Sequence, residues 1–132
     1  MQPRISSIDY LVLTVANIKA TCEFYETILG MTRHEFATPL GDVRTALTFG
    51  SQKINLHEKG RAFDPKADRP TAGSADLCFL TDTDLSVWVA HLQNHNVNII
   101  DGPVPRTGAT GPITSVYIRD PDGNLIEISK RG

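Results

Sequence analysis

The chain has 132 residues, of which 40% are hydrophobic and 21% are charged, and its formal net charge is −2. A chain of this length buries roughly two thirds of its unfolded surface, so we expect one globular domain. The balanced charge and the lack of a basic cluster argue against a nucleic-acid partner. The apolar runs are short and no basic segment precedes an apolar core at the N-terminus, which disfavours a membrane span and secretion.

The two cysteines, Cys22 and Cys78, both stand among apolar neighbours. This setting favours small buried thiols in a reducing compartment over a disulfide framework. We therefore expect a cytoplasmic protein, and a single buried bridge between the two cysteines stays open as an alternative.

The first part of the chain predicts a strand, a helix and three further strands. Ser7 to Val15 is rich in β-branched residues and alternates imperfectly, which is typical of a strand. Asn17 can cap a helix with apolar residues near helical spacing from Ile18 to Leu29, and Gly30 stands where a helix ends. The further strands are expected at Met31 to Ala37, Arg44 to Phe49 and Lys53 to His57, with turns at 39–42 and 50–51.

The second part repeats this pattern after a segment with little periodicity. Residues 59–73 contain Pro65 and Pro70 and predict a linker or an extended surface loop. Asp84 can cap a helix whose apolar face carries Leu85, Trp88, Val89 and Leu92. Strands are expected before and after this helix, at Ala75 to Thr81, Val97 to Ile100, Ile113 to Ile118 and Leu125 to Ser129, with breaks at Gly102-Pro103 and at 120–123.

Two βαβββ modules therefore account for the chain, and the predicted class is α+β. Module one is expected at about 5–58, the linker at about 59–73 and module two at about 74–130. A mostly antiparallel sheet with one helix leaves its second face uncovered. Pairing two such curved sheets, within one chain or across a dimer, would create a cleft lined at period two, which is a natural small-molecule site.

Several segments carry a family resemblance. IDYLVLTV opens the first strand, CEFYETILGM lies on the first helix and RDPDGNLIEIS closes the chain. Together they resemble the vicinal oxygen chelate superfamily, which includes glyoxalase I, fosfomycin and bleomycin resistance proteins and extradiol dioxygenases. FGSQKINLHE, GSADLCFLT and GPVPRTGATGPI look more closely like small glyoxalase-domain proteins, some of them labelled virulence-associated.

The resemblance implies a divalent cation (Ni, Zn, Mn, Mg or Fe) held by one side chain from each of up to four strands. By position, the first ligand falls on Tyr10 and the second near Asn55, with His57 two residues on. The third falls on Asp76, or on Leu77 if the adjoining turn has no extra residue, and the fourth falls on Glu127. Tyrosine binds metal poorly, because its phenol has a pKa of about 10. We therefore take Asp76, Glu127 and His57 as the candidate ligands, and a two-histidine iron dioxygenase site is disfavoured.

Each of these residues also has an ordinary structural reading. Glu127 alternates with Ile126 and Ile128, so its side chain points opposite to them, into the cleft if they face the helix. His57 could instead bond to a neighbouring carbonyl group, and Asp76 could cap a turn. Tyr10 fits either a hydroxyl donor to the substrate or simple aromatic packing.

Two arginines are candidate substrate contacts, together with Asn55. Arg106 opens the segment 106–112, which contains two glycines and reads either as a loop that closes over an anionic ligand or as a hairpin connection. Arg44 at the start of a strand could bind a carboxylate, or form a surface salt bridge.

The function predicted from the resemblance and these residues is that of a metal-dependent lyase or isomerase of the glyoxalase type, acting on a small vicinal-oxygen or carbonyl compound. Glu127, His57 and Tyr10 are its candidate catalytic residues, and a homodimer is expected. The alternative is a metal-free small-molecule binding or resistance protein of the bleomycin-resistance type, and Tyr10 is the residue that favours it.

Overall fold

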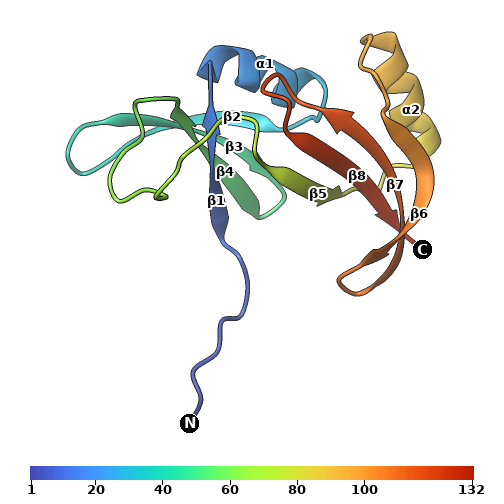
Figure 1. Ribbon diagram of the computed structural model, residues 1–132, viewed down its shortest axis with the longest axis horizontal. Coiled ribbons are helices and arrows are strands. Elements are labelled where there is room, and N and C mark those ends of the chain that lie inside the picture. Colours follow the sequence, from blue (N-terminus) through green and yellow to red (C-terminus); the bar gives the residue numbers. More distant parts are fainter. The chain divides into compact units, whose positions relative to one another are not determined.

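The computed structural model describes all residues from Met1 to Gly132. The chain divides into two compact units, residues 1–70 and residues 71–132. Each unit contains, in chain order, one strand, one helix and three strands (Figure 1). The predicted α+β class with two βαβββ modules is therefore confirmed, and we call residues 1–70 module one and residues 71–132 module two.

Module one has a four-stranded sheet in the order β1-β4-β3-β2. The pair β1–β4 is parallel, and the pairs β4–β3 and β3–β2 are antiparallel. The elements are β1 Tyr10–Val15, α1 Ile18–Thr27, β2 Thr32–Ala37, β3 Val43–Phe49 and β4 Gln52–Glu58.

The residues that flank helix α1 explain where it begins and ends. The side chain of Asn17 accepts a hydrogen bond from the amide of Ala20 at 2.8 Å, so the predicted cap is confirmed. After the helix, Gly30 adopts a φ of 72°, which a glycine reaches without a side-chain clash. The amides of Gly30 and Met31 then donate to the carbonyl groups of Glu26 and Tyr25, and these two bonds satisfy carbonyl groups at the end of the helix.

Module two repeats the topology, with the sheet order β5-β8-β7-β6 and a parallel β5–β8 pair. The pairs β8–β7 and β7–β6 are antiparallel, so both sheets are mostly antiparallel, as expected. The elements are β5 Asp76–Leu80, α2 Leu85–Asn94, β6 Asp101–Gly108, β7 Gly111–Arg119 and β8 Leu125–Arg131.

The DPDGN segment is a structural turn between β7 and β8. The buried Asp120 carboxylate accepts hydrogen bonds from the amides of Asp122 and Asn124 at 2.9 Å and from the Asn124 side chain at 2.8 Å. The Asn124 side chain in turn accepts from the amide of Ala75, just before β5. This turn therefore ties the start of β8 to the start of β5.

The structure corrects several sequence predictions. Residues 97–100 form no strand, and the strand that pairs with β7 is β6, at 101–108. The first strand starts at Tyr10 rather than at Ser7. Asp84 stands at the N-terminus of α2 but makes no side-chain capping bond, and its carboxylate lies 3.4 Å from the Lys130 ammonium instead. Cys78 is exposed rather than buried, whereas Cys22 is buried as expected, and both thiols are free.

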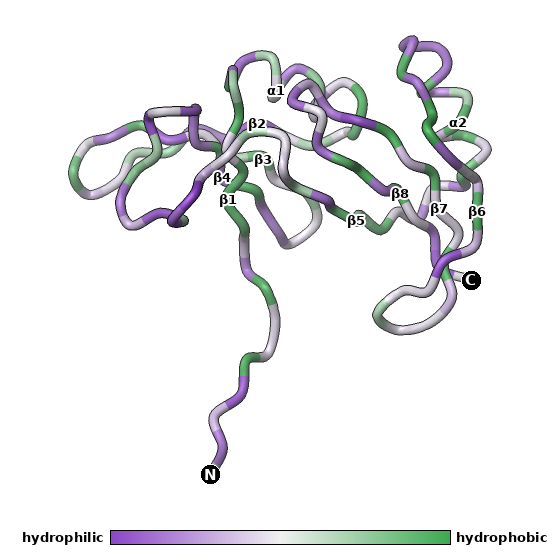
Figure 2. The backbone as a smooth tube through the Cα atoms, in the orientation of Figure 1, coloured by the Kyte–Doolittle hydropathy of each residue, from purple (hydrophilic) through white to green (hydrophobic).

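Alternation along the strands gives each sheet a helix-facing side and an opposite side, which we call the open face. Polar and apolar residues occur along every strand (Figure 2). The buried apolar residues of module one include Leu13, Val15, Leu47, Ile54 and Leu56, and those of module two include Val116, Ile118, Ile126 and Ile128. Between them stand the residues of the open faces. Neither helix has the length and apolar character needed to span a bilayer.

Candidate functional site

Strand register assigns the residues of the two open faces. In module one, Asn55 of β4 pairs with Val12 of β1 and with Ala46 of β3. Its open face therefore comprises Tyr10, Val12, Thr14, Thr32, His34, Phe36, Arg44, Ala46, Thr48, Lys53, Asn55 and His57. In module two, Glu127 of β8 pairs with Cys78 of β5 and Tyr117 of β7. Its open face includes Asp76, Cys78, Leu80, Asp101, Val104, Arg106, Ile113, Ser115, Tyr117, Arg119, Leu125, Glu127, Ser129 and Arg131.

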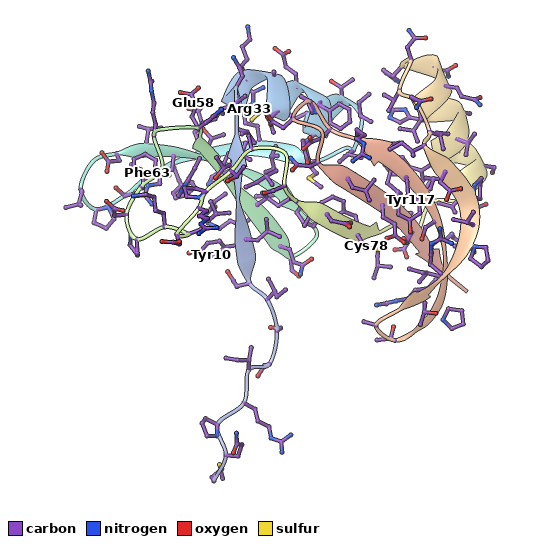
Figure 3. The ribbon with its side chains drawn as sticks, viewed as in Figure 1. Tyr10, Arg33, Glu58, Phe63, Cys78 and Tyr117 are labelled. Atoms are coloured by element: carbon purple, nitrogen blue, oxygen red, sulfur yellow. The ribbon has the colours of Figure 1, made fainter.

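The open face of module one carries an aromatic and basic cluster at one end of β3 and β4. The guanidinium carbon of Arg44 lies 4.0 Å from the centroid of the Phe63 ring, and the His57 ring meets the same ring edge-on at 5.5 Å. Phe63 belongs to the segment that follows β4 (Figure 3). Nε of Arg44 is buried without a hydrogen-bond partner. Arg44 is thus held by stacking rather than by an ion pair.

His57 is the most enclosed polar residue of this cluster, with 7% of its surface exposed. Burial, with a smaller contribution from the positive charge of Arg44, lowers the pKa of its imidazole below the usual value. The ring is therefore held in its neutral form near pH 7, in which one nitrogen can accept a proton or bind a metal. His57 also lines a pocket of about 300 Å³ with Val12, Thr14, Pro65, Lys66, Ala67 and Pro70.

Tyr10, which the resemblance places at the first ligand position, opens β1 and is half exposed. The Lys53 ammonium lies 5.1 Å from its ring centroid and 4.6 Å from that of Phe36. Asn55 is near the centre of the same face, and its Oδ1 is buried without a partner. Tyr10 thus contributes an aromatic ring to this face, and its phenol is available to a ligand.

Glu127 is the centre of the open face of module two. Its Oε2 accepts a hydrogen bond of 2.6 Å from the Ser115 hydroxyl, and Ser115 lies 2.7 Å from the Ser129 hydroxyl. The Ser129 hydroxyl is in turn 3.2 Å from the Cys78 sulfur. Both serines are fully buried. The carboxylate is therefore fixed through one oxygen, and Oε1 carries no hydrogen bond.

A pocket of about 290 Å³ lies beside Glu127 and Cys78. Glu127, Cys78 and Leu80 line it together with residues of the β6–β7 hairpin and Arg131. Although Cys78 is exposed, partial desolvation of its sulfur by neighbouring groups raises the pKa of the thiol, so the sulfur stays protonated near neutral pH. The predicted direction of Glu127, opposite to the buried Ile126 and Ile128, agrees with this arrangement.

Asp76 begins β5 on the same open face, two residues before Cys78, which pairs with Glu127. It is exposed, and its carboxylate makes no hydrogen bond or ion pair. Its predicted alternative role, as a turn cap, is not seen. Two carboxylates with free oxygens on one face suit a hard cation such as Mg²⁺ or Mn²⁺. No group of three or more His, Cys, Asp or Glu side chains is arranged around a common metal position, so the fit is partial.

Arg106 is occupied by neighbouring groups. Its Nε donates to the Tyr117 hydroxyl at 2.9 Å, and a second nitrogen lies 3.4 Å from the Asp101 carboxylate. Residues 106–108 belong to β6, and the hairpin closes with Gly108 paired to Gly111. Of the two readings of 106–112, the structure shows the hairpin connection.

Three contributors to these faces were not found by sequence reasoning. Ser115 and Ser129 both lie in predicted strands. Ser129 is two residues from Glu127, so alternation of side chains along the strand could have placed it on the same face. Phe63 lies in an aperiodic segment, where no sequence signal points to His57 or Arg44.

Comparison with known proteins places the chain among close relatives. It is 54% identical over 130 residues to virulence protein STM3117 of Salmonella typhimurium, covering 98% of this chain and 88% of that protein. It is 51% identical to the glyoxalase domain-containing protein RDO1 of Mycosarcoma maydis, covering 97% of this chain and 70% of that one. An integron cassette protein from the mobile metagenome of V. cholerae superposes with a TM-score of 0.93 at 54% identity and full coverage of both chains.

More distant matches span different activities. A metallothiol transferase, FosB of Staphylococcus epidermidis, is 25% identical over 94% of this chain and 81% of its own length. A lactoylglutathione lyase from Agrobacterium tumefaciens (22% identity, TM-score 0.70, 96% and 95% coverage) and TnmS3, an antibiotic binding protein from Streptomyces (21%, 0.74, 99% and 100%), share the fold. The family model described as Glyoxalase/Bleomycin resistance protein/Dioxygenase superfamily matches residues 7–128, and the chain belongs to this superfamily.

Proposed function

We propose that the protein is a metal-dependent lyase or isomerase that acts on a small vicinal-oxygen or carbonyl compound, with Glu127 as its central residue. The observation that carries the proposal is the Glu127 carboxylate, which lines a pocket and accepts a 2.6 Å hydrogen bond from the buried Ser115 hydroxyl. A carboxylate oriented by buried groups while one oxygen stays free is ready to hold a cation or a substrate proton.

In this proposal Asp76 and Glu127 bind the divalent cation on the open face of module two. A bound divalent cation would supply polarisation of the carbonyl group and stabilisation of negative charge on its oxygens. Ser115 and Ser129 position Glu127, because their hydroxyls donate to its Oε2 at 2.6 Å and 3.4 Å. The carboxylate pair favours Mg²⁺ or Mn²⁺ over metals that prefer several imidazoles.

Residues of module one have separate candidate roles. His57, neutral near pH 7, is proposed as a third ligand or as a proton carrier. Tyr10 and Asn55 are proposed to contact the substrate, as are Arg44 and Arg106. Arg106 must first give up its bonds to Tyr117 and Asp101. We also propose that the modules act as one domain and that two chains form a homodimer, which light scattering of the purified protein would reveal.

The deciding experiment is elemental analysis of protein purified without chelator or affinity-tag nickel, before and after incubation with Mn²⁺, Ni²⁺ or Zn²⁺. We expect near-stoichiometric metal in the wild type and loss of metal in Glu127→Ala and Asp76→Ala. Asp101→Ala is the matched control, because Asp101 is a carboxylate of the same face that pairs with Arg106. If no metal binds to the wild type at any concentration tested, the proposal is wrong.

A metal-free binding protein is the second candidate, and Tyr10 is the observation that favours it. The tyrosine stands at the first ligand position of the family and packs against the Lys53 ammonium rather than presenting an imidazole. This candidate predicts that the protein binds a small molecule equally well with and without chelator. Titration of the same ligand in both conditions separates the two candidates.

A further inference from the structure

The open face of module one lacks acidic groups. Its residues on β1, β2, β3 and β4 include two permanent cations, Arg44 and Lys53, and no aspartate or glutamate. The carboxylates of residues 59–73, which follow β4, have other partners, since Asp64 binds Lys66 at 2.6 Å and Asp68 lies 3.7 Å from Arg69. Neither Arg44 nor Lys53 forms an ion pair, so this face carries uncompensated positive charge.

Arg44 is positioned but unsatisfied. Its guanidinium stacks on Phe63 at 4.0 Å, and stacking uses only the flat face of the group. The N–H groups in the plane of the guanidinium can therefore still donate hydrogen bonds, and Nε of Arg44 is buried without an acceptor. A buried donor without an acceptor destabilises a folded protein, so such a group in a native fold calls for a missing partner.

A second unsatisfied group lies on the same face. Oδ1 of Asn55 is buried without a donor. Asn55 pairs with Ala46, and Arg44 stands two residues from Ala46 on the same side of β3, so the two side chains are neighbours across adjacent strands. A ligand that satisfied both would carry an anionic oxygen group for Arg44 and a hydroxyl donor for Asn55.

We propose that the open face of module one binds a small hydroxycarboxylate, with its carboxylate on the Arg44 guanidinium and its hydroxyl on Asn55. A planar guanidinium held by stacking matches the two oxygens of a planar carboxylate. Lys53, fixed between two aromatic rings, adds positive charge to the same face. The inference deepens the proposed function, since it names the charge of the ligand, but it requires no metal.

The test uses the full-length, ¹⁵N-labelled protein in chelator, so that failure of the metal proposal does not affect it. Lactate, propionate and inorganic phosphate are titrated separately at constant ionic strength, and the Arg44 Nε–H signal is followed by NMR. Lactate is expected to shift this signal saturably and to bind more tightly than propionate, which lacks the hydroxyl. Phosphate binding tighter than lactate would overturn the carboxylate assignment.

Three variants complete the test. Arg44→Gln is expected to weaken lactate binding at least about tenfold, because it removes a charge-assisted pair. Arg44→Lys keeps the charge and loses the fork, and it is expected to retain part of the affinity. Arg33→Gln is the matched control and is expected to bind as the wild type does, because Arg33 lies on the other side of the sheet and pairs with Glu26 at 2.9 Å. Lactate binding that survives Arg44→Gln unchanged, or no saturable shift in the wild type, would disprove the proposal.

Discussion

The two modules share a topology and differ at equivalent positions of their open faces. Asn55 of β4 and Glu127 of β8 occupy the same place, since each pairs with the third residue of the first strand of its module. Their neighbours also correspond, with Tyr10 opening β1 and Asp76 opening β5. The same scaffold thus presents an amide and a phenol in module one, and two carboxylates in module two.

The neighbouring strands continue this contrast. Glu127 of β8 pairs with Tyr117 of β7, and two residues further along these strands Ser129 pairs with Ser115. The corresponding residues in module one are Arg44 and His57. In module two, the small serine hydroxyls beside Glu127 orient its carboxylate. In module one, the larger side chains at these positions are the positively charged Arg44 and the neutral, basic imidazole of His57. The repeated fold sets where these side chains stand, and the substitutions set which charge each face attracts.

The first test of this comparison concerns the two thiols, where we expect the largest effect. Cys78 lies on the open face of module two and is exposed, whereas Cys22 of α1 is fully buried. A maleimide added to the native protein is expected to label Cys78 readily and Cys22 slower by orders of magnitude, because Cys22 reacts only after opening of the fold. Peptide mass spectrometry identifies the labelled residue, and Cys78→Ser is the control. Equal labelling of both residues would mean that the helix-facing side of module one is not closed.

The second test asks whether the helix-facing sides are equivalent although the open faces differ. Leu56 of β4 and Ile128 of β8 are each 2% exposed. Replacing either by alanine is expected to lower the free energy of unfolding by about 2–5 kcal/mol, since it leaves a cavity in a packed core. Urea denaturation of both variants measures the two losses. A loss below about 1 kcal/mol in one module would show that its core is loosely packed.

Strand β6 is the one element that the sequence did not predict. Alternation and helical spacing predicted nine of the ten elements with small errors at their ends, because side chains facing a core repeat with the period of the element. The strand β6 contains Pro103 and Pro105, which argue against a strand. It forms nevertheless because it is the edge strand of its sheet, where a missing backbone donor is tolerated.

The candidate site was predictable only where it depends on local alternation. Alternation with Ile126 and Ile128 placed Glu127 on the open face. The partnership of Ser115 with Glu127 depends on the register between β7 and β8, and the contact of Phe63 with Arg44 depends on the path of an aperiodic segment. Such contacts join residues far apart in sequence, so no spacing rule reveals them. For the same reason the sequence named Arg106 as a candidate contact to an anionic ligand and did not reveal that its Nε donates to the Tyr117 hydroxyl.

The third test removes the group that orients Glu127. Ser115 is fully buried and bridges Glu127 and Ser129. Ser115→Ala is expected to lower the free energy of unfolding by about 1–3 kcal/mol, because both remaining groups lose a partner in a buried setting. In module one, Thr48→Ala is the control, since its hydroxyl bond to the Thr32 carbonyl is exposed and its loss should cost less. Thermal unfolding of the two variants compares them, and an equal loss would deny the Ser115 hydroxyl a special role.

The fourth test uses pH and addresses the group that distinguishes module one. Burial and the positive charge of Arg44 lower the pKa of His57 in the folded protein, so the unfolded chain binds a proton more readily there. The stabilising effect of the neutral imidazole is therefore complete above the unfolded pKa of about 6.5 and is lost as the pH falls below it. Melting temperatures at pH 7.5 and at pH 5.5 should therefore differ more in the wild type than in His57→Gln, which cannot titrate. Arg44→Gln should lie between them, because it removes the lesser of the two causes and leaves burial in place. If His57→Gln loses as much stability in acid as the wild type, then the acid sensitivity arises from other groups, and the neutral state of His57 contributes nothing to the difference between the modules.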